Sequence, residues 1–251
     1  LKKTDKVVIE TAMHERRFDE ALLICQDILS RQDQEVDANY YAAVCLRYLK
    51  RHDHALIQLE KLRQVAPAHS RALQEVGHNF RDIGDMNKAL HFYTRATHIN
   101  PSLQASWKHQ IDILLKFKRK EEASRLIPFL DRVIKMPKPL LAAMDHISQG
   151  RLADAEDLCR DFLSKTPHHV EAMRLLAAIG IKLNVLHDAE FLLESALRLE
   201  PENAMLRVEH IEVLRKRQKI EKAHEGATRL LNEFPNNVHY ASLFAVLCMQ
   251  K

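Results

Sequence analysis

An alanine recurs along this chain at a nearly fixed spacing. Successive members are 34, 34, 34, 32, 34 and 34 residues apart, and they are Ala21, Ala55, Ala89, Ala123, Ala155, Ala189 and Ala223. Twelve residues after most of these alanines stands a proline, namely Pro67, Pro101, Pro167, Pro201 and Pro235. A period of this length is typical of short structural units that stack on their neighbours into a solenoid. The chain has only 5 Gly and 8 Pro in 251 residues, which favours helices as the repeated elements.

One stretch, from Ser70 to Ser102, shows the repeated pattern most fully. Its marked positions are Leu73, Val76, Gly77, Phe80, Gly84, Ala89, Tyr93, Ala96 and Pro101, and Trp107 follows in the next repeat. This pattern resembles the tetratricopeptide repeat (TPR) family, in which each repeat forms two antiparallel helices. The resemblance implies an all-α, right-handed superhelix of about seven and a half helix-turn-helix repeats, with an eighth repeat represented only by its first helix.

Small residues occupy the place where the two helices of a repeat should cross closely. They are Gly77, Ala43, Ala143 and Ala177. Isoleucine stands there in repeats one, four and seven, as Ile9, Ile111 and Ile211, and we expect those helix pairs to lie further apart or to be compensated locally. Gly84, Gly150 and Asn184 fall in the turns between helices, where a positive φ is often required.

The fourth repeat departs from the pattern. It is two residues short, Pro128 lies within its second helix, and KMPKP follows at 135–139. Pro128 cannot donate a hydrogen bond to the carbonyl of Ser124, so we expect a kink there. Two interpretations remain open: a tolerated surface kink, or a joint near 124–139 between repeats 1–4 (1–135) and the stack of repeats 5–7 with the first helix of repeat 8 (136–251).

Motifs of common enzyme classes are missing from the sequence. It has no GxxxxGK[ST] or GxGxxG loop, no HExxH and no GxSxG, and the dense histidines, His52 with His54 and His168 with His169, have no second cluster at ligand spacing. We therefore predict that the chain is not an enzyme and holds no catalytic residue, cofactor or metal.

The cysteines and the lengths of the apolar segments indicate the cellular compartment of the protein. Cys25, Cys45, Cys159 and Cys248 form no CxxC pair, and we interpret them as buried, reduced thiols of a cytoplasmic protein. No run of eighteen apolar residues is present, so we predict no membrane span. The start lacks both a signal-peptide core and an initiating Met, so we do not expect Leu1 to be the natural first residue.

Basic residues cluster at 116–120 (KFKRK) and 215–219 (RKRQK). Each cluster coincides with the expected end of a helix, where cations complement the macrodipole; an anion or nucleic-acid patch is the alternative. With a net charge of only +4, we do not predict nucleic-acid binding.

The inner surface of such a solenoid is lined mainly by the first helix of each repeat. The TPR resemblance implies groove residues at the second, fifth, ninth, twelfth and thirteenth places of a repeat. A polar half of the groove then comprises Arg71, Gln74, His78, Arg81, Lys108 and Asp112, and a second half comprises Leu140, Met144, Ile147, Arg174, Ile181 and Lys182. We predict a scaffold that binds a protein or peptide segment there, either from another protein or from a later domain of the same polypeptide. The alternative for the apolar members is burial between neighbouring repeats.

The stretch from KPLLAAMDHISQG through RLEP at 138–201, with IEVLRKRQKIEKA after it, also resembles the N-terminal region of bacterial TPR–sulfotransferase fusion proteins. That resemblance implies, as an alternative function, an acceptor-recruiting arm of a larger PAPS-dependent enzyme whose catalytic domain is not in this chain.

At the C-terminus, one face of the last expected helix should lack a covering helix. It is formed by Leu243, Phe244, Leu247 and Cys248. We therefore predict that this face is covered by a dimer partner or by further chain.

Overall fold

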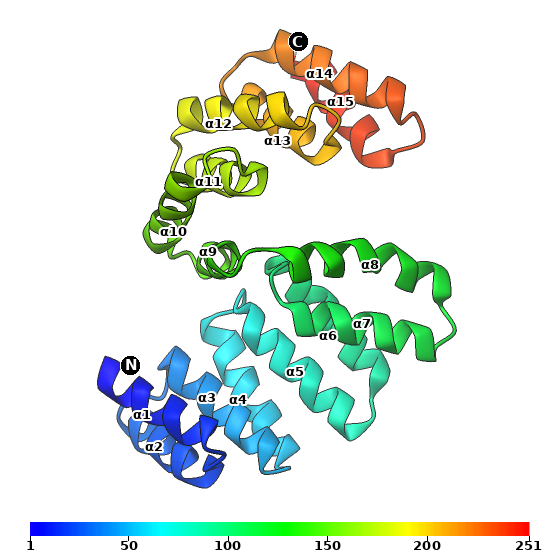
Figure 1. Ribbon diagram of the computed structural model, residues 1–251. Helices are drawn as coiled ribbons and strands as arrows, with labels where there is room; N and C mark the ends of the chain where they lie inside the picture. The colour runs from blue at the N-terminus through cyan, green and yellow to red at the C-terminus, as the bar shows by residue number, and fades with distance from the viewer. Residues whose placement is uncertain (251) are drawn as a thin grey trace. The chain divides into compact units, whose positions relative to one another are not determined.

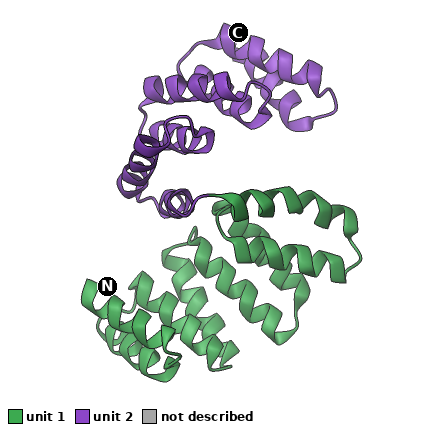
Figure 2. Cartoon of the chain, in the orientation of Figure 1, with its two compact units in different colours: residues 1–136 green, residues 137–251 purple. Residues whose placement is uncertain are grey.

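The computed structural model describes residues 1–250, and all regular secondary structure in that range is α-helical (Figure 1). The helices cluster into two compact units, Leu1–Met136 and Pro137–Lys251 (Figure 2). The first unit contains α1 (Lys3–His14), α2 (Phe18–Arg31), α3 (Val36–Tyr48), α4 (His52–Val65), α5 (Ser70–Ile83), α6 (Met86–Ile99), α7 (Gln104–Lys116) and α8 (Lys120–Lys135). The second contains α9 (Lys138–Ser148), α10 (Leu152–Lys165), α11 (Val170–Lys182), α12 (Leu186–Leu199), α13 (Ala204–Lys216), α14 (Ile220–Glu233) and α15 (Val238–Gln250). The prediction of an all-α array of helical pairs is confirmed.

The periodic alanines lie where the helices pack. All seven have exposed fractions of 1% or less, and each is on the second helix of its repeat. A methyl group is small enough to let the neighbouring helix approach closely. The 34-residue period of the sequence is therefore a period of close helix contacts.

Where the two helices of a repeat cross, a small side chain on one helix is matched by a large side chain on the other. In repeats one, two, three, six and seven, the eighth residue packs with the residue sixteen positions later on the partner helix. Small residues on the first helix face large ones on the second, as with Ala43 and Leu59 or Ala177 and Leu193. Gly77 is the extreme case, because a Cβ built there would lie 2.7 Å from the Tyr93 ring.

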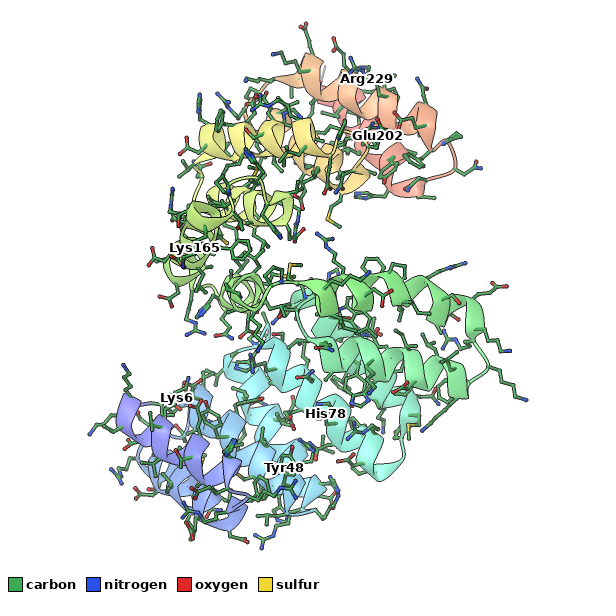
Figure 3. All side chains as sticks on the ribbon, viewed as in Figure 1. Lys6, Tyr48, His78, Lys165, Glu202 and Arg229 are labelled. Carbon is green, nitrogen blue, oxygen red and sulfur yellow. The ribbon has the colours of Figure 1, made fainter. Side chains whose placement is uncertain are left out.

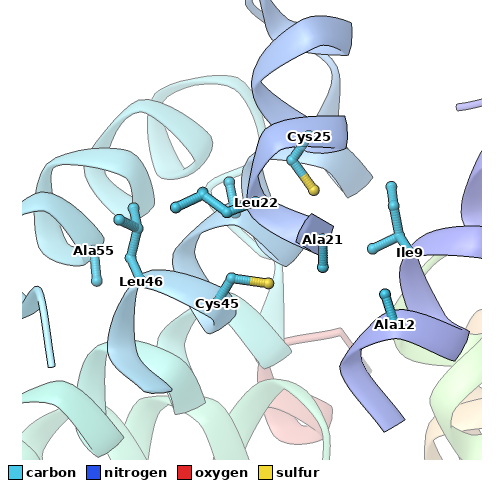
Figure 4. Packing of buried hydrophobic residues seen from close by; sticks show 9 residues of the cluster. Ile9, Ala12, Ala21, Leu22, Cys25, Cys45, Leu46 and Ala55 are labelled. Atoms are coloured by element: carbon cyan, nitrogen blue, oxygen red, sulfur yellow. The ribbon is translucent and has the colours of Figure 1, made fainter. Parts of the chain in front are cut away.

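Two of the three isoleucine repeats, the first and the seventh, reverse this relation. Ile9 packs beside Ala21 and Cys25 (Figure 4), and Ile211 packs against Ala227 while a Cβ at Gly226 would lie 2.9 Å from it. Because the volume lost on one helix is supplied by the other, the close packing of the pair is retained. This is the local compensation that the sequence predicted as one of its two options.

Each turn between the two helices of a repeat holds one residue with positive φ. Gly84, Gly150 and Asn184 have φ of 97°, 75° and 61°, as predicted. The same place in the other four turns is taken by Arg16, Lys50, Lys118 and Gln218, at 59–62°. Left-handed backbone costs about 1–2 kcal/mol for a residue with a Cβ, so these four turns are held by the packing of the helices around them.

Replacing Gly84 with alanine should therefore lower the free energy of unfolding of the first unit by about 1 kcal/mol. A Cβ at Gly84 would meet no atom within 4 Å, so the cost is one of backbone conformation and not of collision. Trp107 is the single tryptophan, and its fluorescence in urea would follow the unit in which it lies. Asn87→Ala, at an exposed helical position, is the control; a Gly84→Ala protein as stable as the unchanged chain would contradict the requirement for positive φ.

Helix α8 continues through Pro128 from Lys120 to Lys135. The proline is exposed, and the Ser124 hydroxyl donates to the Lys120 carbonyl at 2.9 Å one turn earlier. Pro128 thus does not end the helix. A change of stacking direction near 124–139 stays a prediction.

Two expectations about the C-terminal region are wrong. Leu243 and Leu247 are 6% and 0% exposed, because α15 packs them against α14 and α13. Cys25, Cys45 and Cys159 are buried as expected, but Cys248 is exposed. The first helix of a repeat buries its main apolar face on the preceding repeat, whereas we had assigned that face to a following helix. None of the helices described is long and apolar enough to cross a lipid bilayer.

Candidate functional site

A cleft of about 570 Å³ opens in the first unit between helices of the first three repeats. Its lining divides by burial into a buried floor, half-buried walls and an exposed rim. The floor is Val44, Arg47 and Glu75; the walls are Met13, Phe18 and Tyr41; the rim is Glu10, His14, Arg16 and Tyr48. Side chains from α1, α3 and α5 occupy equivalent places in successive repeats, so the repeat itself builds the cleft.

The floor of the cleft is an ion pair between α3 and α5. Arg47 Nε donates to Glu75 Oε2 at 2.7 Å, and the two side chains are only 10% and 7% exposed. Arg47 also lies 3.7 Å from a carboxylate oxygen of Asp82. Because both charges of the pair are matched, the base of the cleft is polar without a net charge.

Aromatic rings form one side of the cleft. Tyr48 stacks on Phe18 with ring centroids 4.4 Å apart, and the Arg47 guanidinium lies 4.4 Å from the Tyr48 centroid. Half of Tyr48 is nevertheless exposed. Elsewhere in the lining, the Tyr41 hydroxyl donates to Glu10 Oε1 at 2.5 Å. The cleft thus presents fixed aromatic surface together with hydrogen-bonding groups.

A cluster of histidine, tyrosine and arginine continues from the cleft floor along α5 toward α7. The His78 Nδ1 and Tyr93 hydroxyl are 2.6 Å apart, and Arg81 Nη1 donates to His109 Nε2 at 2.7 Å. Burial, with Arg47 and Arg81 nearby, lowers the pKa of His78 to about 3. Burial and Arg81 also lower the pKa of His109. Both imidazoles are therefore neutral at pH 7, and the arginines supply the positive charge (His78 and Tyr48 are labelled in Figure 3).

The predicted groove residues of the first unit fall into two groups. Gln74 Nε2 donates to Ser106 Oγ at 2.9 Å, and His78 and Arg81 make the contacts just described. These three side chains join helices to one another. Arg71, Lys108 and Asp112 are exposed, and Arg71 also interacts with Tyr40, so this second group is accessible to a partner.

The predicted groove residues of the second unit are mostly committed to packing. Leu140 is 0% exposed and Ile181 packs on the core of α11–α13, while Met144 and Ile147 are half-buried. Leu140 is therefore not accessible to a partner. This agrees with the alternative that apolar residues at these places are buried between neighbouring repeats. The remaining two members are polar. Arg174 donates to Glu171 at 2.6 Å and to Glu209 at 2.7 Å, and Lys182 is exposed.

Sequence reasoning predicted none of the residues that line the cleft. Met13 and His14 hold the twelfth and thirteenth places of repeat one, and Tyr48 holds the thirteenth place of repeat two. The signal was present, since the same register picked out Arg81 in repeat three. The prediction covers the groove only from the third repeat onward.

Some members of the basic clusters and of the dense histidine groups have local structural roles. Arg119 pairs with Glu122 at 2.6 Å, and Lys219 with Glu190 at 2.6 Å, in the turns that follow α7 and α13. His52 Nδ1 lies 3.1 Å from Asn79 Oδ1. His169 Nδ1 accepts a hydrogen bond from the backbone of Ala172 at the start of α11, so this histidine caps a helix.

Comparison with known proteins gives structural likeness only. No protein-family model and no curated protein matches the chain. A tetratricopeptide repeat protein from Parabacteroides merdae is 14% identical, with a TM-score of 0.46 and coverage of 98% of this chain and 100% of that chain. The TPR2AB domain of yeast Sti1, in complex with pHSP90, is 14% identical, with a TM-score of 0.40 and coverage of 98% and 97%.

A chain of the APC/C hetero-tetramer Cut9–Hcn1 is also similar. It is 14% identical with a TM-score of 0.42, and the match covers 93% of this chain but 46% of that one. The present chain thus spans less than half the length of that protein. None of these three structures is named as a sulfotransferase, so the resemblance to sulfotransferase fusions stays a prediction from sequence.

Proposed function

We propose that this chain is a protein-interaction scaffold, and that the cleft of the first unit binds an extended segment of another polypeptide. The observation that carries the proposal is the lined cleft of about 570 Å³, which lies within the range of ligand pockets, about 300–1,000 Å³. Most of its lining comes from α1, α3 and α5, the first helices of three successive repeats, so the cleft extends along the array. An extended peptide is the class of ligand whose shape follows such a cleft.

The chemistry of the lining suits a peptide. The hydroxyls of Tyr41 and Tyr48 and the Glu10 carboxylate offer donors and acceptors for backbone amides, and the ring edges of Phe18 and Tyr48 offer apolar contact. These rings are already stacked and their orientations fixed. Little side-chain entropy is therefore lost when a ligand packs on them.

Exposed residues of the later helices extend the site. Arg71 lies on α5, and Lys108 and Asp112 lie on α7, at the family's groove places. They carry charges of both signs, so they would select the register of a bound segment more than they would add affinity.

The test begins with a library of twelve-residue peptides displayed on phage and selected on the intact chain. Peptides that emerge are labelled, and their affinities for variants are measured by fluorescence anisotropy. Glu10→Lys reverses a charge on the rim and removes the Tyr41 partner, so we expect about a tenfold loss of affinity, which corresponds to roughly 1.4 kcal/mol.

Glu121→Lys is the matched control, because Glu121 is exposed on α8 and does not line the cleft. It should leave the affinity unchanged, and circular dichroism should show the same helix content in both variants. Selection of no peptide, or selection of peptides that bind Glu10→Lys as tightly as the unchanged chain, would refute the cleft as the binding site.

A further inference from the structure

Three metal-ligating side chains meet on the second unit, outside the proposed cleft. Glu190 and Glu194 lie one turn apart on α12, and His210 lies on α13, which packs against it. Each can offer one ligand atom such that all three atoms lie within 4.8 Å of one another. Because residues four apart share one face of a helix, the two carboxylates are directed to the same side as the imidazole.

The His210 imidazole has an unsatisfied nitrogen at this place. Its Nε2 is buried and has no hydrogen-bond partner among residues 1–250. The nearest opposite charge is a carboxylate oxygen of Glu194, at 3.8 Å, which is too far for a hydrogen bond. A buried polar atom without a partner is costly in a native protein and calls for an explanation, of which a bound ion is one.

We propose that Glu190, Glu194 and His210 form a binding site for a divalent transition-metal ion, with Zn²⁺ as the ion that this ligand set fits. Zn²⁺ is bound in proteins by histidine nitrogen and by carboxylate oxygen, and three protein ligands leave a position for water. A metal at this place joins α12 to α13. It would also supply the partner that His210 Nε2 lacks.

Two cations already neutralise Glu190. The Lys219 ammonium lies 2.6 Å from Glu190 Oε1, and Arg217 bonds to Oε2. A metal ion that binds Glu190 must compete with both Arg217 and Lys219, and Lys219 contacts both carboxylate oxygens, at 2.6 and 3.0 Å. Lys219 therefore competes with the metal, and the affinity should rise when Lys219 is removed.

The experiment is a calorimetric titration of the intact chain with Zn²⁺, repeated with Co²⁺ so that the ligand field can be followed by visible absorption. His210→Gln and Glu194→Gln each remove one ligand, and we expect each to weaken binding by about tenfold or more, since even partners of ligands commonly cost 10–100-fold. Lys219→Met should strengthen it, because a positive charge beside the ion is removed while the packing of the stem is kept. Metal should also raise the melting temperature of the unchanged chain, since it binds the folded state.

The chain has 15 histidines, so the control must separate this site from adventitious binding. His187→Gln removes an exposed histidine of the same helix and should change nothing. If His187→Gln and His210→Gln lose the same small amount of binding, or Lys219→Met has no effect, the chain binds adventitious metal only and the proposal is overturned. Glu194 is half-exposed, so Glu194→Gln keeps the test decisive should His210→Gln fail to fold.

Discussion

Replacing Glu75 with leucine should lower the free energy of unfolding of the first unit by about 3–5 kcal/mol. The change leaves the Arg47 guanidinium almost buried, at 10% exposure, without its closest counter-charge. Asp82, 3.7 Å from Arg47, compensates that charge only in part, and a buried charge that has lost its hydrogen-bonded partner is among the most costly single defects a fold can carry. Urea denaturation followed by Trp107 fluorescence reports on this unit, because Trp107 lies in α7.

Two further variants test whether the loss of stability comes from burying an unpaired charge or from losing an ion pair of any kind. Arg47→Met combined with Glu75→Leu removes both charges and should recover most of the loss, because replacing a buried pair with apolar side chains is often neutral or stabilising. Glu122→Ala breaks the Arg119 pair, which is as close at 2.6 Å as the 2.7 Å of the buried pair but nearly half-exposed, and should destabilise the unit far less, because water screens exposed charges. If Glu75→Leu and Glu122→Ala cost the same amount, the Arg47–Glu75 pair is not structural.

The fold follows from the sequence to an unusual degree, and the reason is repetition. The 34-residue alanine ladder identified the positions at which helices touch, and all seven alanines are buried. Gly84, Gly150 and Asn184 marked three turns, and the structure shows the same left-handed residue in the other four. A packing or turn requirement that occurs once is hard to recognise in a sequence, but one that recurs seven times produces a detectable periodicity.

The candidate sites were less predictable because each depends on contacts between different repeats. The Arg47–Glu75 pair joins positions 28 apart, and the His210 cluster joins two helices with no shared motif. Leu140 shows the opposite error: its register predicted a groove position, but local packing buries it completely. Register assigns a residue to a face of a helix. The neighbouring helix decides whether that face is open.

The matching of small and large side chains on paired helices can be tested at Gly77, where the two helices leave no room for an added Cβ. Gly77→Ala should lower the free energy of unfolding of the first unit by about 1–3 kcal/mol, although alanine favours helices more than glycine does. The added methyl group would lie 2.7 Å from the Tyr93 ring. That ring is fully buried and held through its hydroxyl by His78, so it has little freedom to move aside.

Tyr93→Leu should reverse the sign of the same change. Alone it opens a cavity and leaves His78 Nδ1 without its partner, so it destabilises the unit. In that background Gly77→Ala fills space, and it reproduces the alanine–leucine pairs found at Ala43 with Leu59 and Ala177 with Leu193. The double-mutant cycle should therefore give a coupling free energy of about 1–3 kcal/mol in favour of the double variant. If the two changes have additive effects on the free energy of unfolding, the helices relax by moving as whole units. The complementary side-chain volumes would then not set the distance between the paired helices.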